Sequence, residues 1–441
     1  MAVVAAVAAA INRYADFDNN PLNPMKPLKN SEKSAFVSCL SLAAMALPGL
    51  MQDAAAGRVE ETYNADFQYG NYSESNKRMN VDIFEGVLAT PIGKSMTASV
   101  NLVRDTIAGA SPVYNQKNAN GKVKQILSGA SPQSECGASI CEQRDAISSG
   151  LTYFFDTASV NVGGGLSREH DYTSRFFNTN LSLDLNKKLT TLNYGASVAF
   201  DEIEPSPSPW NSHPVGFVRN KTSQQYLLGV SQVIDKDSLL QSNMTFAYSS
   251  GYMSDPYKKV AFYDANAPLL FNGVLYANAL KSDNRPQEKF QWAWLTQYIR
   301  HFGQFNDAAL HVDYRFSTDD WGVNAYTTEL SWYQPIGNGW QLIPRFRYYS
   351  QDQADFYQAV GNNLKATVYS SDYRLAGFGA ISGGIKLSKE INDLKPLSQL
   401  KFQTGFEYYD HSADYQLGGN HAGSFADFSY YLVTASFNLK F

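Results

Sequence analysis

The most constraining feature of this chain is a regular alternation of apolar and polar residues over its last eleven positions. The residues of one parity are apolar and largely aromatic: Tyr431, Val433, Ala435, Phe437, Leu439 and Phe441. The positions between them are mostly polar: Leu432, Thr434, Ser436, Asn438 and Lys440. Because successive side chains of a β-strand point to opposite faces, this segment is predicted to be a strand with one apolar and one polar face.

The same alternation recurs upstream, at 63–69, 192–200, 240–248 and 308–316. Aromatic residues make up 14% of the chain and charged residues only 17%, against about 25% charged residues in an ordinary soluble domain. The mean hydropathy of −0.33 is nevertheless too polar for a helical membrane protein. A soluble β-sandwich also alternates, but it does not need so many aromatic residues. The combination is typical of a β-barrel with an apolar outer face and a polar inner face.

The alternation and the turn residues predict about sixteen strands. These lie near 60–72, 77–90, 95–109, 145–156, 158–169, 174–185, 190–203, 222–234, 239–250, 288–301, 307–317, 322–335, 340–351, 372–390, 399–411 and 426–441. An even number fits a single-chain bacterial barrel. The segments 77–90 and 288–301 alternate poorly. A glycine run at 163–165 falls inside a predicted strand, where it predicts a kink or close packing of a neighbour.

The connections between these strands fall into two groups. Tight links are expected near 91–94, 186–188, 235–237, 337–339 and 393–396, and long links near 110–144, 204–221, 251–287 and 352–371. Counted back from the last strand, all the tight links lie at one end and all the long ones at the other. The predicted fold is therefore an all-β, transmembrane, antiparallel up-and-down barrel with short periplasmic turns and long extracellular loops.

The first 56 residues are expected to lie outside the barrel. The apolar stretch 35–51 follows Lys26, Lys29 and Lys33 and runs into small residues, which is the pattern of a secretory signal peptide. Met25 directly precedes these lysines, so residues 1–24 are either the product of a misplaced start site or a real extension. The expected organisation is an extension (1–24), a signal peptide (25–56) and a barrel (57–441).

The final strand resembles the C-terminal signature of bacterial outer-membrane proteins, because it is amphipathic and its last residue is Phe441. The resemblance implies a place in the outer membrane of a Gram-negative bacterium, in contact with lipid and lipopolysaccharide. It also implies recognition of this strand by the barrel-assembly machinery. Nucleic acid is not an expected partner, since 36 Lys and Arg residues are outnumbered by 41 Asp and Glu residues and form no basic run.

Two further motifs carry a second resemblance. Asp105-Thr-Ile-Ala-Gly-Ala-Ser-Pro is partly repeated at 128–132, and Ser-Arg-Glu-His-Asp-Tyr spans 167–172. Over most of 59–441 the chain resembles an uncharacterised porin-like family of outer-membrane proteins with an Asp-x-Ile-x-Gly-Ala-Ser-Pro motif. Members of that family are often encoded beside secreted flavin-attachment and thioredoxin-like proteins. The resemblance thus implies a possible periplasmic partner in redox or metal handling.

Charged residues collect on the predicted inner face. The lumen-lining candidates are Asp201, His311, Asp313, Arg315, Glu329, Arg345, Arg347 and Glu407. They form either a solvated wall with cross-strand ion pairs or a selectivity lining with a transverse field. Arg345 and Arg347 are expected to point inward, where Asp313 or Glu329 could pair with them. Leu342, Phe346 and Tyr348 are expected to face lipid, because a lipid-facing Arg costs about 2–4 kcal/mol at mid-membrane.

At the predicted external rim, Asp105, Glu169 and Asp171 could bind Ca²⁺ through oxygen ligands or could accept hydrogen bonds that pin the 110–144 loop. Cys136 and Cys141 lie in that loop with four residues between them. In an oxidising compartment they are expected to form a disulfide, with metal binding and free thiols as alternatives. No His or further Cys lies close in sequence, so no metal ligand set is predicted.

The six histidines sit in no catalytic motif, so we predict no enzyme activity, no catalytic residue and no cofactor. Two functions of different classes remain. One is a passive channel for small polar solutes, and the other is a non-conducting barrel that serves as a scaffold for a partner.

Overall fold

The structure is a computed structural model. It describes residues 62–75, 78–109, 112–127, 140–206, 213–214, 216–271, 274–419 and 427–441. All of them belong to one compact unit, Glu32–Phe441. The predicted extension and signal peptide, as well as Cys136, lie outside the described residues, so those predictions and the disulfide remain untested.

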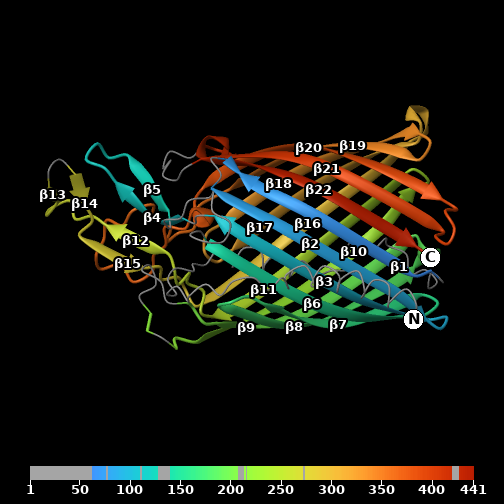
Figure 1. The fold of residues 1–441 in the computed structure, drawn as a ribbon, viewed down its shortest axis with the longest axis horizontal. Coiled ribbons are helices and arrows are strands. Elements are labelled where there is room, and N and C mark those ends of the chain that lie inside the picture. Colours follow the sequence, from blue (N-terminus) through green and yellow to red (C-terminus); the bar gives the residue numbers. More distant parts are fainter. Residues whose placement is uncertain are drawn as a thin grey trace, which may run out of the picture. The chain divides into compact units, whose positions relative to one another are not determined.

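Sixteen strands of the described chain close into an antiparallel barrel (Figure 1). They are β1 (Asn64–Glu74), β2 (Met79–Ile92), β3 (Met96–Gly109), β6 (Ile140–Phe154), β7 (Ala158–Arg168), β8 (Tyr172–Leu185), β9 (Thr190–Ile203), β10 (Arg219–Asp235), β11 (Ser238–Gly251), β16 (Glu288–Phe302), β17 (Ala308–Asp319), β18 (Asn324–Gly337), β19 (Trp340–Gln351), β20 (Phe378–Asn392), β21 (Gln399–Ser412) and β22 (Phe428–Lys440). Each strand pairs with the next, and β22 pairs with β1 to close the ring. The closed sheet leaves no open edge. The predicted fold class is therefore confirmed.

Two predicted strand starts differ from the structure by five residues or more. The segment 372–377 was expected to begin a strand, but Asp372 instead caps a short 3-10 helix, η6 (Tyr373–Leu375), by accepting a hydrogen bond from the backbone N–H of Arg374. β20 begins only at Phe378. The other 3-10 helices among the described residues are η4 (Asn186–Lys188), η5 (Gly303–Phe305) and η7 (Ala413–Tyr415). β6 begins five residues earlier than expected, because it follows β3 up to the pair Gly109 and Ile140.

The poor alternation of β2 has a structural cause. Met79 and Val81 are buried against Ile107 of β3, with Tyr72 and Ile83 packed beside them. Phe84, on the other face of β2, is exposed. Part of this strand is thus apolar on both faces, which hides the period of two.

Tight links near 91–94, 186–188, 235–237, 303–307, 337–339 and 393–396 lie at one end of the barrel, called the turn end below, whereas two other short links, 169–171 and 320–323, lie at the opposite end. The backbones of the turn-end links use left-handed conformations at Gly93, Asn186, Asn306, Asn338 and Asp393, among others. Gly339, with φ +72°, illustrates why small residues occur here: a Cβ atom would lie 2.3 Å from the Glu390 carbonyl oxygen. Such turns need residues that tolerate positive φ, and this requirement made the links recognisable in the sequence.

The glycine run at 163–165 lies within β7 and allows a close approach, one of the two alternatives predicted for it. A Cβ atom on Gly165 would lie 2.5 Å from the ring of Phe176 on β8. The ring of Phe176 therefore lies against the backbone of Gly165, where a larger residue would not fit.

The other end of the barrel, called the loop end below, carries the long connections. The strand prediction treated them as loops, but they contain short hairpins. These are β4 (Pro112–Lys117) with β5 (Val123–Leu127), β12 (Lys259–Phe262) with β15 (Ala279–Ser282), and β13 (Leu269–Phe271) with β14 (Val274–Tyr276). Two small apolar cores lie here, one of Val260, Phe262 and Tyr369, and the other around Trp321 and Tyr357.

The connection 252–287 contacts loops from several sides of the ring. The backbone N–H groups of Lys117 and Ser206 donate to the hydroxyls of Tyr263 and Tyr257, at 2.9 and 2.7 Å. Ser371 Oγ donates to the carbonyl of Lys259 at 2.8 Å. These partners follow β3, β9 and β19, which are well separated in the strand order of the ring. The 252–287 connection therefore bridges the loop end.

Candidate functional site

The strand registers arrange the charged inner residues in rows that run across neighbouring strands. Asp313, Glu329, Arg347, Ser382, Tyr409 and Tyr430 are successive cross-strand partners on β17 to β22. The adjacent row contains His311, Ser331, Arg345, Gly384 and Glu407. The opposite face of the same strands carries exposed Leu330, Phe346 and Phe406. The rows therefore share the face turned away from this apolar belt.

Arg345 is the centre of an ion-paired cluster that links β18, β19 and β21. Its Nε and Nη2 both donate to Glu329 at 2.7 Å, and its Nη1 donates to Glu407 at 2.8 Å. Two-point contact of a guanidinium with a carboxylate is a strong and directional arrangement. The partner of Arg345 is thus Glu329, not Asp313.

Arg347 lies next to this cluster but is not part of it. Within the described chain, no hydrogen bond or ion pair joins its guanidinium to another residue. It lines a hollow of about 360 Å³ together with aromatic side chains of β1 and β19 to β22. Sequence reasoning placed Arg347 among the lumen-lining candidates but did not find this hollow, because its rings come from strands far apart in the chain.

The remaining inner candidates are dispersed. Asp201, nearly fully buried, forms an ion pair of 2.9 Å with Lys221 on β10. The ring of His311 lies 4.3 Å from that of Tyr333. Asp313 keeps one buried carboxylate oxygen without a hydrogen-bond partner in the described chain. Arg315 lies one row from Arg347, opposite Thr327. These residues do not converge on a single point.

The three rim candidates are buried, and two of them, Asp105 and Asp171, make side-chain contacts. Asp105 on β3 forms an ion pair with Arg144 on β6, whose Nε donates to it at 2.7 Å. Asp171 accepts a hydrogen bond of 2.6 Å from the hydroxyl of Tyr257, which belongs to the bridging connection. Asp171 thus helps to fix 252–287 rather than the 110–144 loop.

Glu169 differs from its neighbours because neither of its carboxylate oxygens has a hydrogen-bond partner in the described chain. Burial raises the pKa of Glu169 to about 9, Asp171 adds to the increase, and Arg144 opposes it. The side chain is therefore protonated at neutral pH in the folded protein. The unfolded chain releases this proton near the ordinary Glu pKa of about 4.3.

This difference predicts a pH dependence that Glu169→Gln should remove. Between about pH 4.3 and 9 the folded state binds more protons than the unfolded state, so the contribution of Glu169 to stability falls as pH rises. The wild-type protein should lose its folded gel band at progressively lower temperatures from pH 6 to pH 9. The variant should show a smaller decrease, and identical slopes for both proteins would contradict the assignment.

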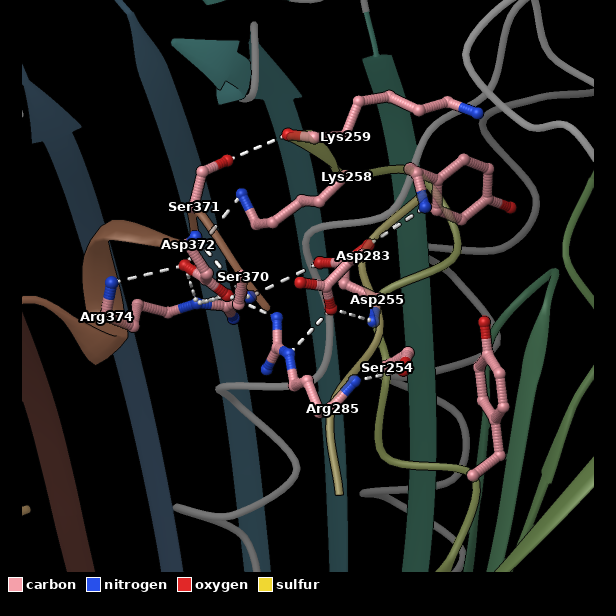
Figure 2. A network of polar contacts seen from close by, with 12 residues as sticks. Ser254, Asp255, Lys258, Lys259, Asp283, Arg285, Ser370, Ser371, Asp372 and Arg374 are labelled. Atoms are coloured by element: carbon pink, nitrogen blue, oxygen red, sulfur yellow. Dashed lines mark hydrogen bonds and ion pairs between the residues drawn. The ribbon is translucent and has the colours of Figure 1, made fainter. Parts of the chain in front are cut away.

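A polar network at the loop end was not foreseen from the sequence (Figure 2). Asp372, which is 1% exposed, accepts from Arg374 Nε at 2.9 Å and from Arg285 Nη2 at 2.9 Å. Arg285 Nε also donates to Asp283 at 2.6 Å, and the N–H of Asp255 donates to the same carboxylate at 2.8 Å. Lys258 lies 3.9 Å from Asp372. The network joins the 252–287 connection to the 352–377 connection.

The charges of this network hold one another in place. Burial alone would raise the pKa of Asp372, but Arg374, Lys258 and Arg285 outweigh burial and hold that pKa well below its usual range. Asp372 is therefore ionised throughout the physiological pH range. Members of the network are up to 119 positions apart in sequence, which is why no local pattern revealed them.

No metal or membrane-spanning helix is apparent in the parts of the chain that the structure describes. No group of three or more His, Cys, Asp or Glu side chains there is arranged to hold a metal ion. No helix there is long and apolar enough to cross a membrane.

Comparisons with solved structures and curated proteins place the chain as follows. It is similar to OccD3 (OpdP) of Pseudomonas aeruginosa, at 10% identity and a TM-score of 0.40, over 87% of this chain and 93% of that chain. It is similar to OccAB1 of Acinetobacter baumannii, at 9% identity and a TM-score of 0.39, over 86% and 96%. A mutant of the ferric enterobactin receptor PfeA of Pseudomonas aeruginosa matches at 8% identity and a TM-score of 0.41, over 80% and 54%. No curated protein matches the sequence.

A family model gives the clearest assignment. The model described as "Protein of unknown function (DUF3570)" matches residues 37–432. The match does not test the Asp-x-Ile-x-Gly-Ala-Ser-Pro motif that suggested the resemblance. Because the matched segment includes almost the whole barrel, the chain belongs to the family described as Protein of unknown function (DUF3570).

Proposed function

We propose that the protein is a porin-like barrel of the outer membrane of a Gram-negative bacterium that conducts small polar solutes. The observation that carries this proposal is the contrast between the two faces of one closed sheet. The outer face exposes large apolar side chains on strands around the ring, among them Phe67, Phe177, Tyr226, Phe346 and Phe437. An apolar belt of this extent is expected only where lipid covers it.

The inner face supports the conducting part of the proposal. Sixteen strands enclose more space than one layer of side chains fills. Arg347 has no ion partner among the described residues, so it needs water or an ion beside it, because an unpaired buried charge is costly. A hydrated inner wall of this kind suits small polar or charged solutes. The outer face would contact lipid, the loop end lipopolysaccharide, and the barrel-assembly machinery would insert the chain.

The test is single-channel recording with the purified protein in planar lipid bilayers. Stepwise currents in 1 M KCl are expected, since an aqueous lumen carries ions. The inserted protein should also migrate faster on gels before heating than after, as folded barrels do. Complete absence of steps from protein that passes the gel test would contradict the channel.

A second function, a non-conducting interaction barrel, is favoured by one specific observation. The 252–287 connection bridges the loop end and is held there by the Asp372 network and by the Asp171–Tyr257 hydrogen bond. A bridge of this kind restricts entry from the loop end. A folded barrel that is silent in bilayers would therefore support the interaction barrel.

A further inference from the structure

A hollow in the inner wall combines aromatic rings with one cation, Arg347, that has no ion partner among the described residues. It has a volume of about 360 Å³. Six of its lining residues are aromatic: Tyr72, Tyr349, Phe378, Tyr409, Phe428 and Tyr430. Ligand pockets generally have volumes of about 300–1,000 Å³, so this hollow suits a molecule with one or two rings.

The hollow exists because β20 carries small side chains between two strands that carry large ones. Ala380 pairs with Tyr349 of β19, and Ser382 pairs with Tyr409 of β21. All four residues line the hollow, so the small side chains leave room between the two tyrosines. The depression thus follows from residue size at fixed register positions of the sheet, independently of any loop.

Three of the rings, Tyr72, Tyr430 and Tyr409, lie next to one another. The ring centroids of Tyr409 and Tyr430 are 4.4 Å apart and their planes differ by 16°, and Tyr72 lies 4.5 Å from Tyr430. The rings of Tyr349 and Phe378 lie 5.5 Å apart. Within the described chain, the hydroxyls of Tyr409 and Tyr430 have no hydrogen-bond partner. They are available to a bound molecule.

Arg347 is left without an anion by the arrangement of its neighbours. Its cross-strand partner is Glu329, but both carboxylate oxygens of Glu329 accept from Arg345. Glu407 also accepts from Arg345. The described part of the chain therefore offers Arg347 no carboxylate, although it holds Arg347 at the edge of an aromatic surface.

We propose that this hollow binds a planar aromatic molecule with a single negative charge, such as an aromatic carboxylate. The guanidinium of Arg347 would hold the anionic group, because charge-assisted bonds from Arg to a carboxylate are strong. The tyrosine rings would contact the face of the planar body, since stacked and edge contacts of aromatic rings are favourable. This proposal rests on the proposed function for its route of entry, whereas binding itself does not require conduction.

The test is calorimetric titration of the detergent-solubilised, folded full chain with three ligands of similar size. Benzoate is planar and anionic, cyclohexanecarboxylate is anionic but not planar, and benzamide is planar but neutral. Benzoate should bind at least about tenfold more tightly than either of the others, after subtraction of a detergent blank. Equal affinity for the two carboxylates would overturn the planar part of the proposal, and equal affinity for benzoate and benzamide would overturn the anionic part.

Two variants separate the roles of the cation and the rings. Arg347→Gln should weaken benzoate binding about tenfold or more and leave benzamide unchanged. Tyr430→Leu should reduce the preference for benzoate over cyclohexanecarboxylate. Arg175→Gln is the matched control, because Arg175 is exposed on the outer face of β8, opposite the exposed Phe200, and it should bind benzoate like the wild type. A loss in the control equal to that in Arg347→Gln would overturn the proposal.

The outcomes distinguish this proposal from the channel. Benzoate binding to a barrel that shows no conductance steps would contradict the channel and support the hollow as a binding site. Conductance steps from a barrel that binds none of the three ligands would support the channel and overturn the hollow.

Discussion

Replacement of Asp372 by Asn is expected to release the bridge across the loop end while the barrel stays folded. The substitution keeps the shape of the side chain but removes the negative charge that holds Arg285, Arg374 and Lys258. These cations would remain in a buried place with one carboxylate fewer to balance their charge. Loss of one member of a buried ion pair generally costs about 3–5 kcal/mol. The barrel strands are not part of the network, so their hydrogen bonds should persist.

The measurement is limited proteolysis of the 252–287 connection in the folded protein. A local cost of about 3 kcal/mol corresponds to an increase in cleavage rate on the order of a hundredfold, if cleavage follows the population of the open loop. Asp355→Asn is the matched control, since Asp355 lies in the same connection as Asp372 but is exposed and forms no ion pair among the described residues. Equal cleavage of the two variants would show that the network does not hold the bridge.

The same variant also bears on conduction. If the 252–287 connection narrows the opening at the loop end, Asp372→Asn should give larger current steps than the wild type under identical salt and voltage. Steps of unchanged size, with cleavage accelerated as expected, would show that the connection does not restrict flow. Because the pKa of Asp372 is held well below its usual range, the difference between the proteins should be constant at all pH values above about 4.

The second large effect is expected from Arg345→Glu combined with Arg347→Glu. The change reverses two positive charges next to Glu329 and Glu407, so that this part of the wall becomes strongly negative. A ring or patch of one sign selects ions of the opposite sign. The reversal potential in a KCl gradient should therefore shift toward that of a cation-selective channel. An unchanged reversal potential would contradict either the inward direction of these residues or the channel itself.

Two further variants keep this experiment interpretable. Lys187→Glu with Lys188→Glu changes the net charge by the same amount in a tight link of the turn end, and it should shift the reversal potential much less. Arg347→Glu alone should shift the potential in the same direction as the double variant. It breaks no ion pair within the described chain, so it should insert even if the double variant fails to fold.

The barrel itself could be predicted because its signals are local. Alternation marks most strands, and residues that tolerate positive φ mark most of the tight links, as at Asn186 and Gly339. Local signals also set the limits of the prediction. β2 was difficult because Met79 and Val81 bury an apolar inner face, and the start of β20 was wrong because Asp372 caps η6 instead of pairing in the sheet.

The loop-end network and the aromatic hollow could not be predicted in the same way. Arg285 and Asp372 are 87 positions apart, and Lys117 meets Tyr263 across 146 positions. The hollow needs the register of β1 and β19 to β22, which alternation alone does not fix, because a shift by two residues preserves every facing. Sequence patterns therefore indicated which residues are inner-face candidates but not which of them meet.

The pairing of β1 with β22 has a consequence for the connectivity of the chain. Asn64 and Lys440 are partners in the register that closes the ring, so the two ends of the barrel sequence lie side by side. A short Gly-Asn-Gly type of linker between them, with new ends opened at the 337–339 link, would give a circular permutant. Such a permutant would retain every strand pair of the barrel. Its chain would begin with β19 and end with β18. Because the ring is closed, no strand is first in its structure. The strand at which the chain begins is set by the gene and not by the barrel.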